Sequence, residues 1–189
     1  MPKYNTIAII GKSGAGKDTL LQEILECLPQ ETHKIITYTT RPMREGEVNG
    51  KNYFFVTQEE FASIPMIEST CFKGNWYYGT SLQSFDETKV NIGVFNPSGV
   101  KNLLKHEEIN LTIVLIDTSD KVRLLRSLLR EEAPDCQEIV RRFLADEEDF
   151  KDLSFKTYNI KNENPAERRE ATAALRILVQ SQGALGKTD

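Results

Sequence analysis

No other segment limits the possible folds of this chain as strongly as an apolar pentapeptide that runs directly into a glycine-rich turn. Residues 6–10 read TIAII and residues 11–19 read GKSGAGKDT. A continuous apolar run is typical of a strand buried on both faces, the usual situation in a parallel sheet. Residues 19–28 then carry leucine and isoleucine at helical spacing, so the pattern predicts a strand, a glycine loop and a helix that ends near Pro29.

Strands and helices are predicted to alternate through the rest of the chain. Three further apolar runs predict strands at residues 91–95, 111–116 and 157–160. Capping signals mark three helix starts: Thr57 with Glu60, Asp135 with Glu138, and Asn164 followed by Pro165. This alternation predicts an α/β fold. Residues 37–85 interrupt it with glycine, asparagine, threonine and aromatic residues, which predicts an inserted small subdomain of short strands and turns.

Composition excludes several classes of protein. The chain has 189 residues, which suits one domain with insertions, and a net charge of −4, which gives no overall attraction to nucleic acid. Cys27, Cys71 and Cys136 form no C-x-x-C pair, so we expect neither a disulfide framework nor a thiolate metal site. No stretch approaches the roughly 20 apolar residues that span a bilayer. The sequence predicts a soluble cytoplasmic protein without nucleic-acid or membrane partners, and it leaves the oligomeric state open.

The glycine-rich turn matches the phosphate-binding loop G-x-x-x-x-G-K-[ST] at Gly11, Gly16 and Lys17. Glycines let backbone N–H groups approach phosphate oxygens, the following helix adds the positive end of its dipole, and the lysine supplies a point charge. A nucleotide site is therefore predicted, the alternative being a chance glycine turn. Asp18 stands where the motif has a magnesium-binding hydroxyl, and Thr19 comes one residue late. Asp18 is either a first-turn aspartate that favours the helix start or a sign of a cation close by.

Three motifs farther along the chain resemble those of the guanylate kinase family in order and spacing. Residues 39–53 read T-T-R-P-x-R-x-G-E-x-x-G-x-x-Y, residues 67–68 read I-E, and residues 74–80 read G-N-x-Y-Y-G-[ST]. With the phosphate loop, the resemblance covers nearly the whole chain. It implies a single domain with an α/β fold: a P-loop kinase core with a parallel β-sheet flanked by helices, an inserted small nucleoside monophosphate (NMP)-binding subdomain and a helical lid. The expected boundaries are about 1–36, 86–125 and 146–189 for the core, 37–85 for the subdomain and 126–145 for the lid.

The resemblance also implies an acceptor site for GMP or dGMP. It assigns Arg41 and Arg44 to the acceptor phosphate, Tyr53 and Tyr78 to hydroxyl donors for the same group, and Glu68 to the guanine edge. Guanidinium groups match phosphate geometry, and a carboxylate, which only accepts hydrogen bonds, matches the N1–H and amino donors of guanine. Further acceptor-site residues implied by the resemblance are Thr37, Glu47 and Thr80, with Glu47 organising the two arginines, and Asn96 is also expected at this site.

The donor site is expected at the phosphate loop, with MgATP as the phosphoryl donor. Its expected residues are Gly11, Ser13, Gly14, Ala15, Gly16, Lys17, Asp18, Thr19, Arg126 and Asn162. Arg123, Arg126 and Arg130 share one helix face by spacing, which is usually a solvated face, but the resemblance places Arg126 and Arg130 near the donor and Arg142 in the lid. The expected catalytic residues are Lys17, Arg41, Arg130 and Arg142.

Two departures from the family pattern leave alternatives open. Besides Asp18, the end of the third core strand reads VFNPSG, which places Val94 and Asn96 where the family has two aspartates. Asp18 is then the candidate magnesium carboxylate, directly or through water, and Asn96 would orient a water or the acceptor. The main hypothesis is transfer of the γ-phosphate of MgATP to GMP or dGMP. The alternatives are a kinase of another NMP or of ribose 1,5-bisphosphate, and a catalytically silent protein-binding module.

Overall fold

The strand predicted at residues 6–10 is β1 (Tyr4–Ile10), the central strand of a five-stranded sheet in the computed structural model, which describes residues 2–72, 74–130 and 132–185. In spatial order the strands are β2 (Thr32–Lys34), β7 (Val90–Val94), β1, β8 (Ile109–Asp117) and β9 (Tyr158–Lys161). Every pairing in this sheet is parallel. The predicted parallel sheet is confirmed, whereas β2 has no counterpart among the predicted strands because its residues THK contain no apolar run.

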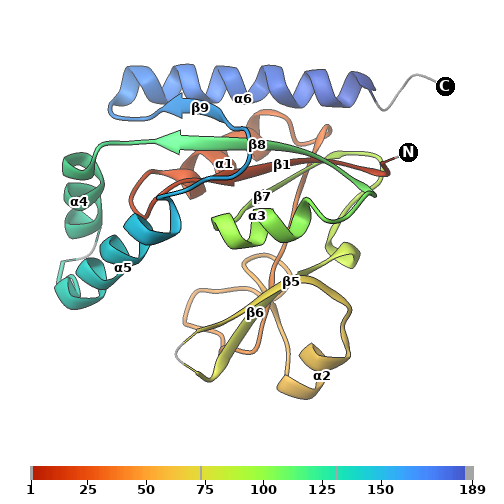
Figure 1. Cartoon of the computed structure of the whole chain (residues 1–189), viewed down its shortest axis with the longest axis horizontal. Helices are drawn as coiled ribbons and strands as arrows, with labels where there is room; N and C mark the ends of the chain where they lie inside the picture. Colours follow the sequence, from red (N-terminus) through yellow and green to blue (C-terminus); the bar gives the residue numbers. More distant parts are fainter. Residues whose placement is uncertain (1, 73, 131, 186–189) are drawn as a thin grey trace.

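Helices cover both faces of the main sheet. Successive residues of β1 point to opposite faces, and each face has its own apolar core. Ile9 packs in the core with α1 (Lys17–Cys27) and α6 (Pro165–Leu185), whereas Ile10 packs in the core with α3 (Pro97–Leu103). Figure 1 shows α6 and α3 on opposite sides of the sheet. Burial on both faces explains the continuous apolar run of β1.

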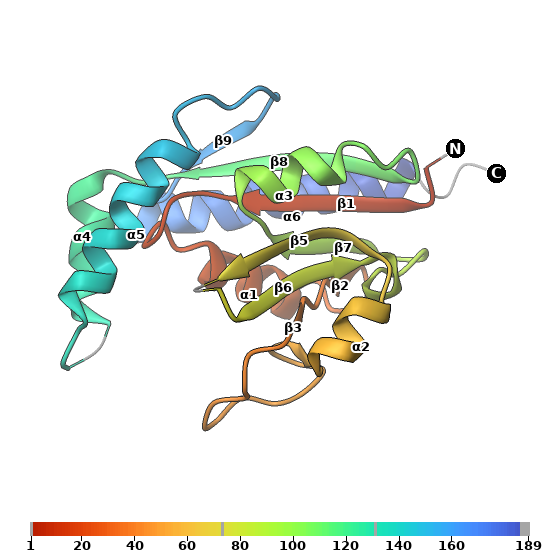
Figure 2. The same ribbon diagram turned by 60° about the horizontal axis from the view of Figure 1, so that its bottom comes forward.

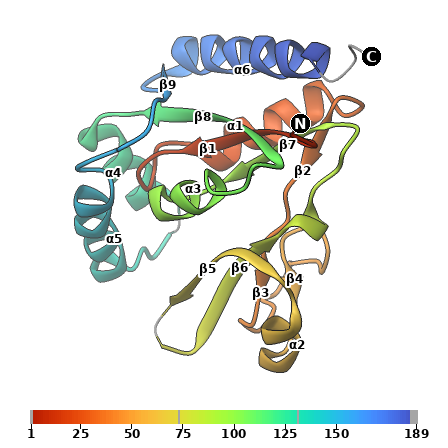
Figure 3. The same cartoon turned by 45° about the vertical axis from the view of Figure 1, so that its right-hand side comes forward.

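A second sheet lies within the segment predicted to be an inserted subdomain. Its strands, in spatial order, are β4 (Phe54–Phe55), β3 (Tyr38–Thr39), β6 (Trp76–Ser81) and β5 (Met66–Phe72). The short helices α2 (Gln58–Ser63) and η1 (Leu82–Ser84) belong to the same stretch of chain. Strand β5 contacts α3 of the main unit, and Figure 3 shows the second sheet on the side of α3, away from α6. Figure 2 shows the second sheet below the main sheet.

Two of the predicted helix starts have the predicted caps. Thr57 accepts a hydrogen bond from the N–H of Glu60 and Glu60 accepts one from the N–H of Thr57, which completes the capping box of α2. Asn164 Oδ1 accepts the N–H groups of residues 166 and 167, and α6 begins at Pro165. These local signals were sufficient because a cap depends on residues close in sequence.

The second predicted capping box, at Asp135 and Glu138, is half formed. Asp135 Oδ1 accepts the N–H of Glu138 at 3.0 Å and begins α5 (Cys136–Asp149). Glu138, however, directs its two oxygens to the guanidinium groups of Arg141 and Arg142, so the second half of the box does not form. These hydrogen bonds lower the pKa of Glu138 to about 2. Charged donors are stronger partners for a carboxylate than a neutral backbone N–H.

The order of connections places the glycine loop at the edge where ligands bind in such sheets. The chain passes from β1 to β2 and β7 on one side, and then to β8 and β9 on the other. Ligands of open α/β sheets bind outside the carboxyl ends of the strands, where the direction of winding reverses. The helices α4 (Asp120–Leu129) and α5 also lie at this end of the sheet (Figure 1).

Candidate active site

Hydrogen bonds from three other segments of the chain hold the phosphate loop in place. The carbonyl oxygen of Ala15 accepts hydrogen bonds from Asn162 Nδ2 at 2.7 Å, Thr118 Oγ1 at 3.2 Å and Arg126 Nη1 at 3.3 Å. Gly16 caps α1 with φ 94°, and a Cβ at this position would lie 2.5 Å from Asn162 Nδ2, so the loop requires glycine here. Each of these donors fixes the shape of the loop.

Arg126 and Asn162 therefore support the phosphate loop, whereas the sequence predicted that they contact ATP. Besides Ala15, Arg126 Nη2 contacts the carbonyl oxygens of Asn162 at 2.8 Å and Glu163 at 3.3 Å. Asn162 is 2% exposed, and its Oδ1 lacks a hydrogen-bond partner among the described residues. A direct contact of either side chain with ATP stays a prediction.

Lys17 begins α1 and lies at the mouth of the loop. Its Nζ donates to the carbonyl oxygen of Lys12 at 3.1 Å. Burial lowers the pKa of Lys17, while Asp18 and Asp146 act in the opposite direction. Asp18 and Thr19 follow in the exposed first turn of the helix. Lys17 is thus a half-buried cation whose solvation is already reduced, which strengthens its attraction for an anion.

A cavity of about 330 Å³ opens in front of the loop. Its lining includes the predicted residues Gly11, Ser13, Lys17, Thr37, Tyr53, Glu68, Tyr78 and Asn96. It also includes Thr70, Val94, Phe95, Asp146, Asp149 and Phe150, which were not predicted as site residues. The cavity thus brings together the phosphate loop, the end of β7, the second sheet and α5.

Glu68 is the acidic group that the second sheet contributes to this cavity. Its Oε1 accepts the hydroxyl hydrogen of Thr80 at 2.7 Å, and Thr80 itself is fully buried. Burial raises the pKa of Glu68, and the Thr80 hydrogen bond lowers it. Asn96 lines the same cavity, but its Oδ1 accepts the N–H of Gly99 at 2.7 Å and caps α3. The fixed carboxylate of Glu68 can accept further hydrogen bonds from a ligand with paired N–H donors.

Arg41 is built into the second sheet by its neighbours. It is 5% exposed, its Nη2 donates to Glu47 Oε1 at 2.7 Å, and its Cζ lies 5.5 Å from the ring centroid of Tyr53. The other oxygen of Glu47 accepts the backbone N–H of Arg44 at 2.7 Å. The Arg41 hydrogen bond is the main cause of a lowered pKa of Glu47, and the hydrogen bonds that Arg41 makes to Glu47 and Tyr78 raise the pKa of Arg41. Glu47 thus connects the two arginines assigned to the acceptor phosphate.

A second cavity, of about 210 Å³, also has Ser13 in its lining. Three predicted arginines line it from different segments: Arg44 from the second sheet's long loop, Arg130 from the end of α4 and Arg142 from α5. Ser13 and Gly14 of the phosphate loop complete one wall. Arg142 Nε donates to Glu138 Oε1 at 2.8 Å. Cationic groups from three segments thus meet at the loop, which suits a phosphate group between them.

Comparison with known proteins decides the family. The family model described as guanylate kinase matches residues 3–171. The chain belongs to the guanylate kinase family. It is 32% identical over 179 residues to a guanylate kinase of Campylobacter jejuni (strain RM1221), covering 90% of this chain and 87% of the relative. It is 30% identical over 185 residues to a guanylate kinase of Helicobacter hepaticus, covering 93% and 90%.

The fold agrees with that of a solved guanylate kinase. The crystal structure of guanylate kinase from Anaplasma phagocytophilum aligns with 96% of this chain and 88% of that chain, with a TM-score of 0.60 and 18% sequence identity. The predicted α/β class with a parallel sheet flanked by helices is therefore confirmed.

Several residues that line the larger cavity were not predicted from the sequence of this member of the guanylate kinase family, although local patterns pointed to them. Asp146, Asp149 and Phe150 follow Arg142 by four, seven and eight residues, so they share its helix face. Thr70 follows Glu68 by two residues on β5, so it points to the same face of the second sheet. Applying helix and strand periodicity outward from the predicted site residues would have found all four.

Proposed function

We propose that this chain transfers the γ-phosphoryl group of ATP to GMP or dGMP, giving ADP and GDP or dGDP. As a member of the guanylate kinase family it is a phosphotransferase. One observation carries the choice of acceptor: Glu68, fixed by Thr80, lines the same cavity as Lys17 of the phosphate loop. A base-reading carboxylate and a phosphate-binding lysine in one cavity support a guanine nucleotide as the substrate between them.

In this proposal the second sheet binds the acceptor. Glu68 accepts hydrogen bonds from the N1–H and amino group of guanine, whereas adenine would present an acceptor at N1 and be disfavoured. Arg41 and Arg44, organised by Glu47, bind the acceptor phosphate, and the hydroxyl groups of Tyr53 and Tyr78 donate to it. The network around Arg41 supports this role because it holds the guanidinium group before any ligand arrives, which reduces the entropy lost on binding.

Catalysis in this proposal is mainly electrostatic. Lys17 and the N–H groups of the phosphate loop stabilise the charge on the donor phosphates, and Arg130 and Arg142 approach the transferred group from the second cavity. Direct in-line transfer requires no covalent intermediate with the protein. Residues 37–85 would act as the NMP-binding subdomain and residues 126–145 as the lid, and their closure would exclude water from the reacting groups. Helix α4 runs through residue 126 and α5 extends past residue 145, so the lid borders lie within helices.

The donor set near the loop suits a hydrated magnesium ion. Within the described ranges, no three or more His, Cys, Asp or Glu side chains gather as a metal cluster. Magnesium in kinases keeps several waters and takes only one or two carboxylates together with substrate phosphates. Asp18, exposed beside Lys17, is the carboxylate that we assign to this role. The ion would neutralise charge on the donor phosphates.

We also propose a cytoplasmic location. Cys27, Cys71 and Cys136 are free and exposed, which suits a reducing compartment. Among the described residues, no helix combines the length and apolar character needed to cross a bilayer.

The alternative activities leave features of the site without a use. Ribose 1,5-bisphosphate carries no base, so it would leave the half-buried Glu68 without a hydrogen-bonding ligand. A protein-binding module would not need Lys17 and the three arginines that meet at the loop.

A coupled assay of ADP formation tests the proposal directly. With MgATP as donor, we expect turnover of GMP and dGMP and at least a hundredfold lower kcat/KM for AMP, CMP, dTMP and ribose 1,5-bisphosphate. Lys17→Ala should lose most of kcat and keep GMP binding, because the lysine acts on the transferred group and Glu68 on the base. Failure of both guanine nucleotides to react would refute the proposed function.

A further inference from the structure

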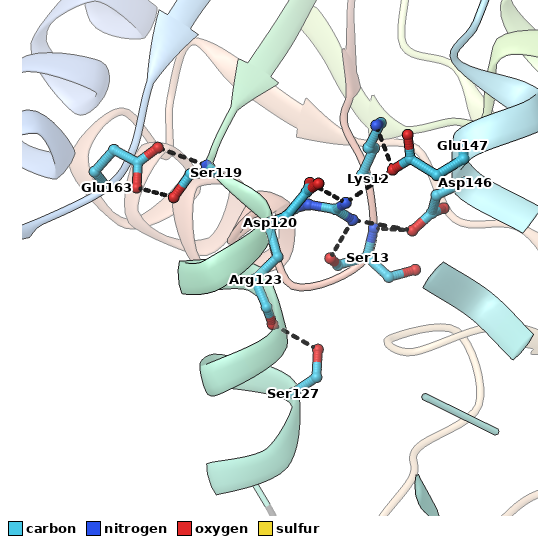
Figure 4. Close-up of polar contacts among 9 residues, drawn as sticks. All are labelled: Lys12, Ser13, Ser119, Asp120, Arg123, Ser127, Asp146, Glu147 and Glu163. Atoms are coloured by element: carbon cyan, nitrogen blue, oxygen red, sulfur yellow. Dashed lines mark hydrogen bonds and ion pairs between the residues drawn. The ribbon is translucent and has the colours of Figure 1, made fainter. Parts of the chain in front are cut away.

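One carboxylate of α5 lies against the phosphate loop. Asp146 Oδ2 accepts the backbone N–H of Ser13 at 2.6 Å, and the Asp146 side chain is only 15% exposed. Asp146 also acts electrostatically on Lys17. Figure 4 shows the Asp146 carboxylate pointing at the Ser13 nitrogen. A carboxylate of the chain itself thus lies where backbone N–H groups and a lysine are arranged for an anion.

Two cations tie this part of α5 to the loop and to α4. Lys12 Nζ donates to Glu147 Oε1 at 2.5 Å. Arg123 is 1% exposed, and its guanidinium group contacts the Ser13 carbonyl oxygen at 3.3 Å, Glu147 at 3.2 Å and Asp120 at 2.7 Å. The same group lies 3.5 Å from Asp146 Oδ2 and 4.6 Å from the ring centroid of Phe143 of α5. The loop, α4 and α5 therefore form one ionic network (Figure 4).

The donor phosphates and the Asp146 carboxylate would compete for the backbone N–H of Ser13. The N–H of Ser13 cannot donate with good geometry to both Asp146 Oδ2 and a phosphate oxygen. Several negative charges brought next to a carboxylate that is mostly buried would also repel it strongly. Arg123 keeps Asp120 as a partner if α5 moves, because both residues lie on α4, so the network can open without leaving that buried cation unpaired.

We propose that Asp146 gates the donor site: its carboxylate must leave the Ser13 N–H before the donor phosphates bind there, and α5 moves with it. The inference rests on the proposed function, because it takes the phosphate loop as the ATP site. Asp146, Asp149 and Phe150 also line the acceptor cavity. Displacement of α5 by the donor therefore reshapes the acceptor site, which couples the binding of the two substrates.

Calorimetric titration with ADP in EDTA tests the gate without turnover or metal. Asp146→Asn keeps the shape of the side chain but removes the charge, so we expect ADP to bind at least tenfold more tightly than to the wild type. Glu148→Gln is the matched control, because it removes one negative charge from an exposed position of the same helix. The gate would be overturned if Asp146→Asn weakened ADP binding. It would also be overturned if the fold increase in ADP affinity in Asp146→Asn were less than five times that in Glu148→Gln.

A third variant separates this inference from the proposed function. Lys17→Ala should weaken ADP binding because the loop loses its lysine. Wild-type affinity in Lys17→Ala would refute the loop as the donor site and with it the proposed function, whereas weakened binding there with an unchanged Asp146→Asn would refute the gate alone.

Wild-type protein carries a second test in case Asp146→Asn does not fold. On addition of ADP, the carboxyl ¹³C resonance of Asp146 should move toward that of exposed aspartates, and the Ser13 amide proton should shift with it, since they share the 2.6 Å hydrogen bond. An Asp146 carboxyl resonance that stays in place at saturating ADP would overturn the gate.

Discussion

At the scale of single residues, Glu68 combines two opposing effects on its ionisation. Burial raises the pKa of Glu68 and the Thr80 hydroxyl lowers it, with burial the larger effect. The ionised carboxylate only accepts hydrogen bonds, as guanine requires, whereas the protonated form places an O–H donor against the N1–H of the base. Guanine binding should therefore weaken as the pH falls through the raised pKa.

This ionisation gives the first prediction. The KM for GMP should rise as the pH falls, and the rise should begin at a higher pH than the ordinary glutamate pKa of about 4.3 would give. The KM for ATP should change less. Thr80→Val should move the rise to higher pH because it removes the hydroxyl that favours the charged form. Glu68→Gln should raise the KM for GMP at every pH and remove the pH-dependent limb. Steady-state kinetics at a series of pH values checks this, and a limb that persists in Glu68→Gln would assign the titration to another group.

Asp18 supports a second prediction. It acts electrostatically on Lys17, Lys34 and Tyr53, so its charge reaches both the loop and the acceptor cavity. Asp18→Asn should raise the magnesium concentration needed for half-maximal rate severalfold, because one carboxylate near the phosphates is lost. Asp18→Ser should recover metal use only together with Asn96→Asp, a change that keeps a good cap on α3.

Melting temperatures measured beside the magnesium titrations give the control for Asp18. If Asp18 is only a favourable first-turn residue, Asp18→Asn should lower stability by at most about 1 kcal/mol and leave the magnesium requirement unchanged. That pair of results would eliminate the metal role.

At the scale of elements, the sequence predicts structure well where the determining contacts are local. Strand β1 and the caps at Thr57 and Asn164 depend on adjacent or nearby residues, and they form as predicted. Strand β2 exists because it pairs with β7, Thr32 with Val90, and such distant pairing leaves no pattern in a three-residue segment. Glu138 shows a different limit, since the two arginines that draw it away from its cap lie only one turn later, and one local contact replaces another.

Helix α6 provides a prediction about packing. Leu175 is fully buried in the core shared with α1, whereas Ile177 on the same helix is 66% exposed. Leu175→Ala should lower the free energy of unfolding by about 2–5 kcal/mol, because it removes apolar contacts and leaves a cavity. Ile177→Ala is the control and should change it by no more than about 0.5 kcal/mol. Urea denaturation measures both, and equal losses would mean that α6 does not pack on the sheet as described.

At the scale of the whole molecule, the site could be predicted only in part. The phosphate loop follows from its own motif, but the positions of Glu68 and Tyr78 in the cavity of Lys17 depend on how the second sheet packs against α3. The resemblance to a family supplied their roles, since no local pattern reports such long-range proximity. Helix periodicity from Arg142 places Asp146 on the same face of α5, but its contact with Ser13 leaves no local pattern because it joins segments 133 residues apart.

The division of the site between separate units leads to the last prediction. The residues that we propose to bind the acceptor lie on the second sheet, Lys17 on the main unit and Arg142 on α5. In that proposal bound GMP would contact groups that bound ATP alone does not hold together. Misplacement of catalytic groups by about 1 Å can cost about 100-fold in rate. ATP alone should therefore yield ADP slowly, and GMP should accelerate ADP formation on the order of 100-fold, with one GDP formed per ADP. Guanosine, which has the base but lacks the phosphate for Arg41 and Arg44, should give little acceleration. Chromatographic measurement of ADP and GDP checks both expectations; equal ADP formation with and without GMP would show that the catalytic groups are already assembled and that acceptor binding does not complete the site.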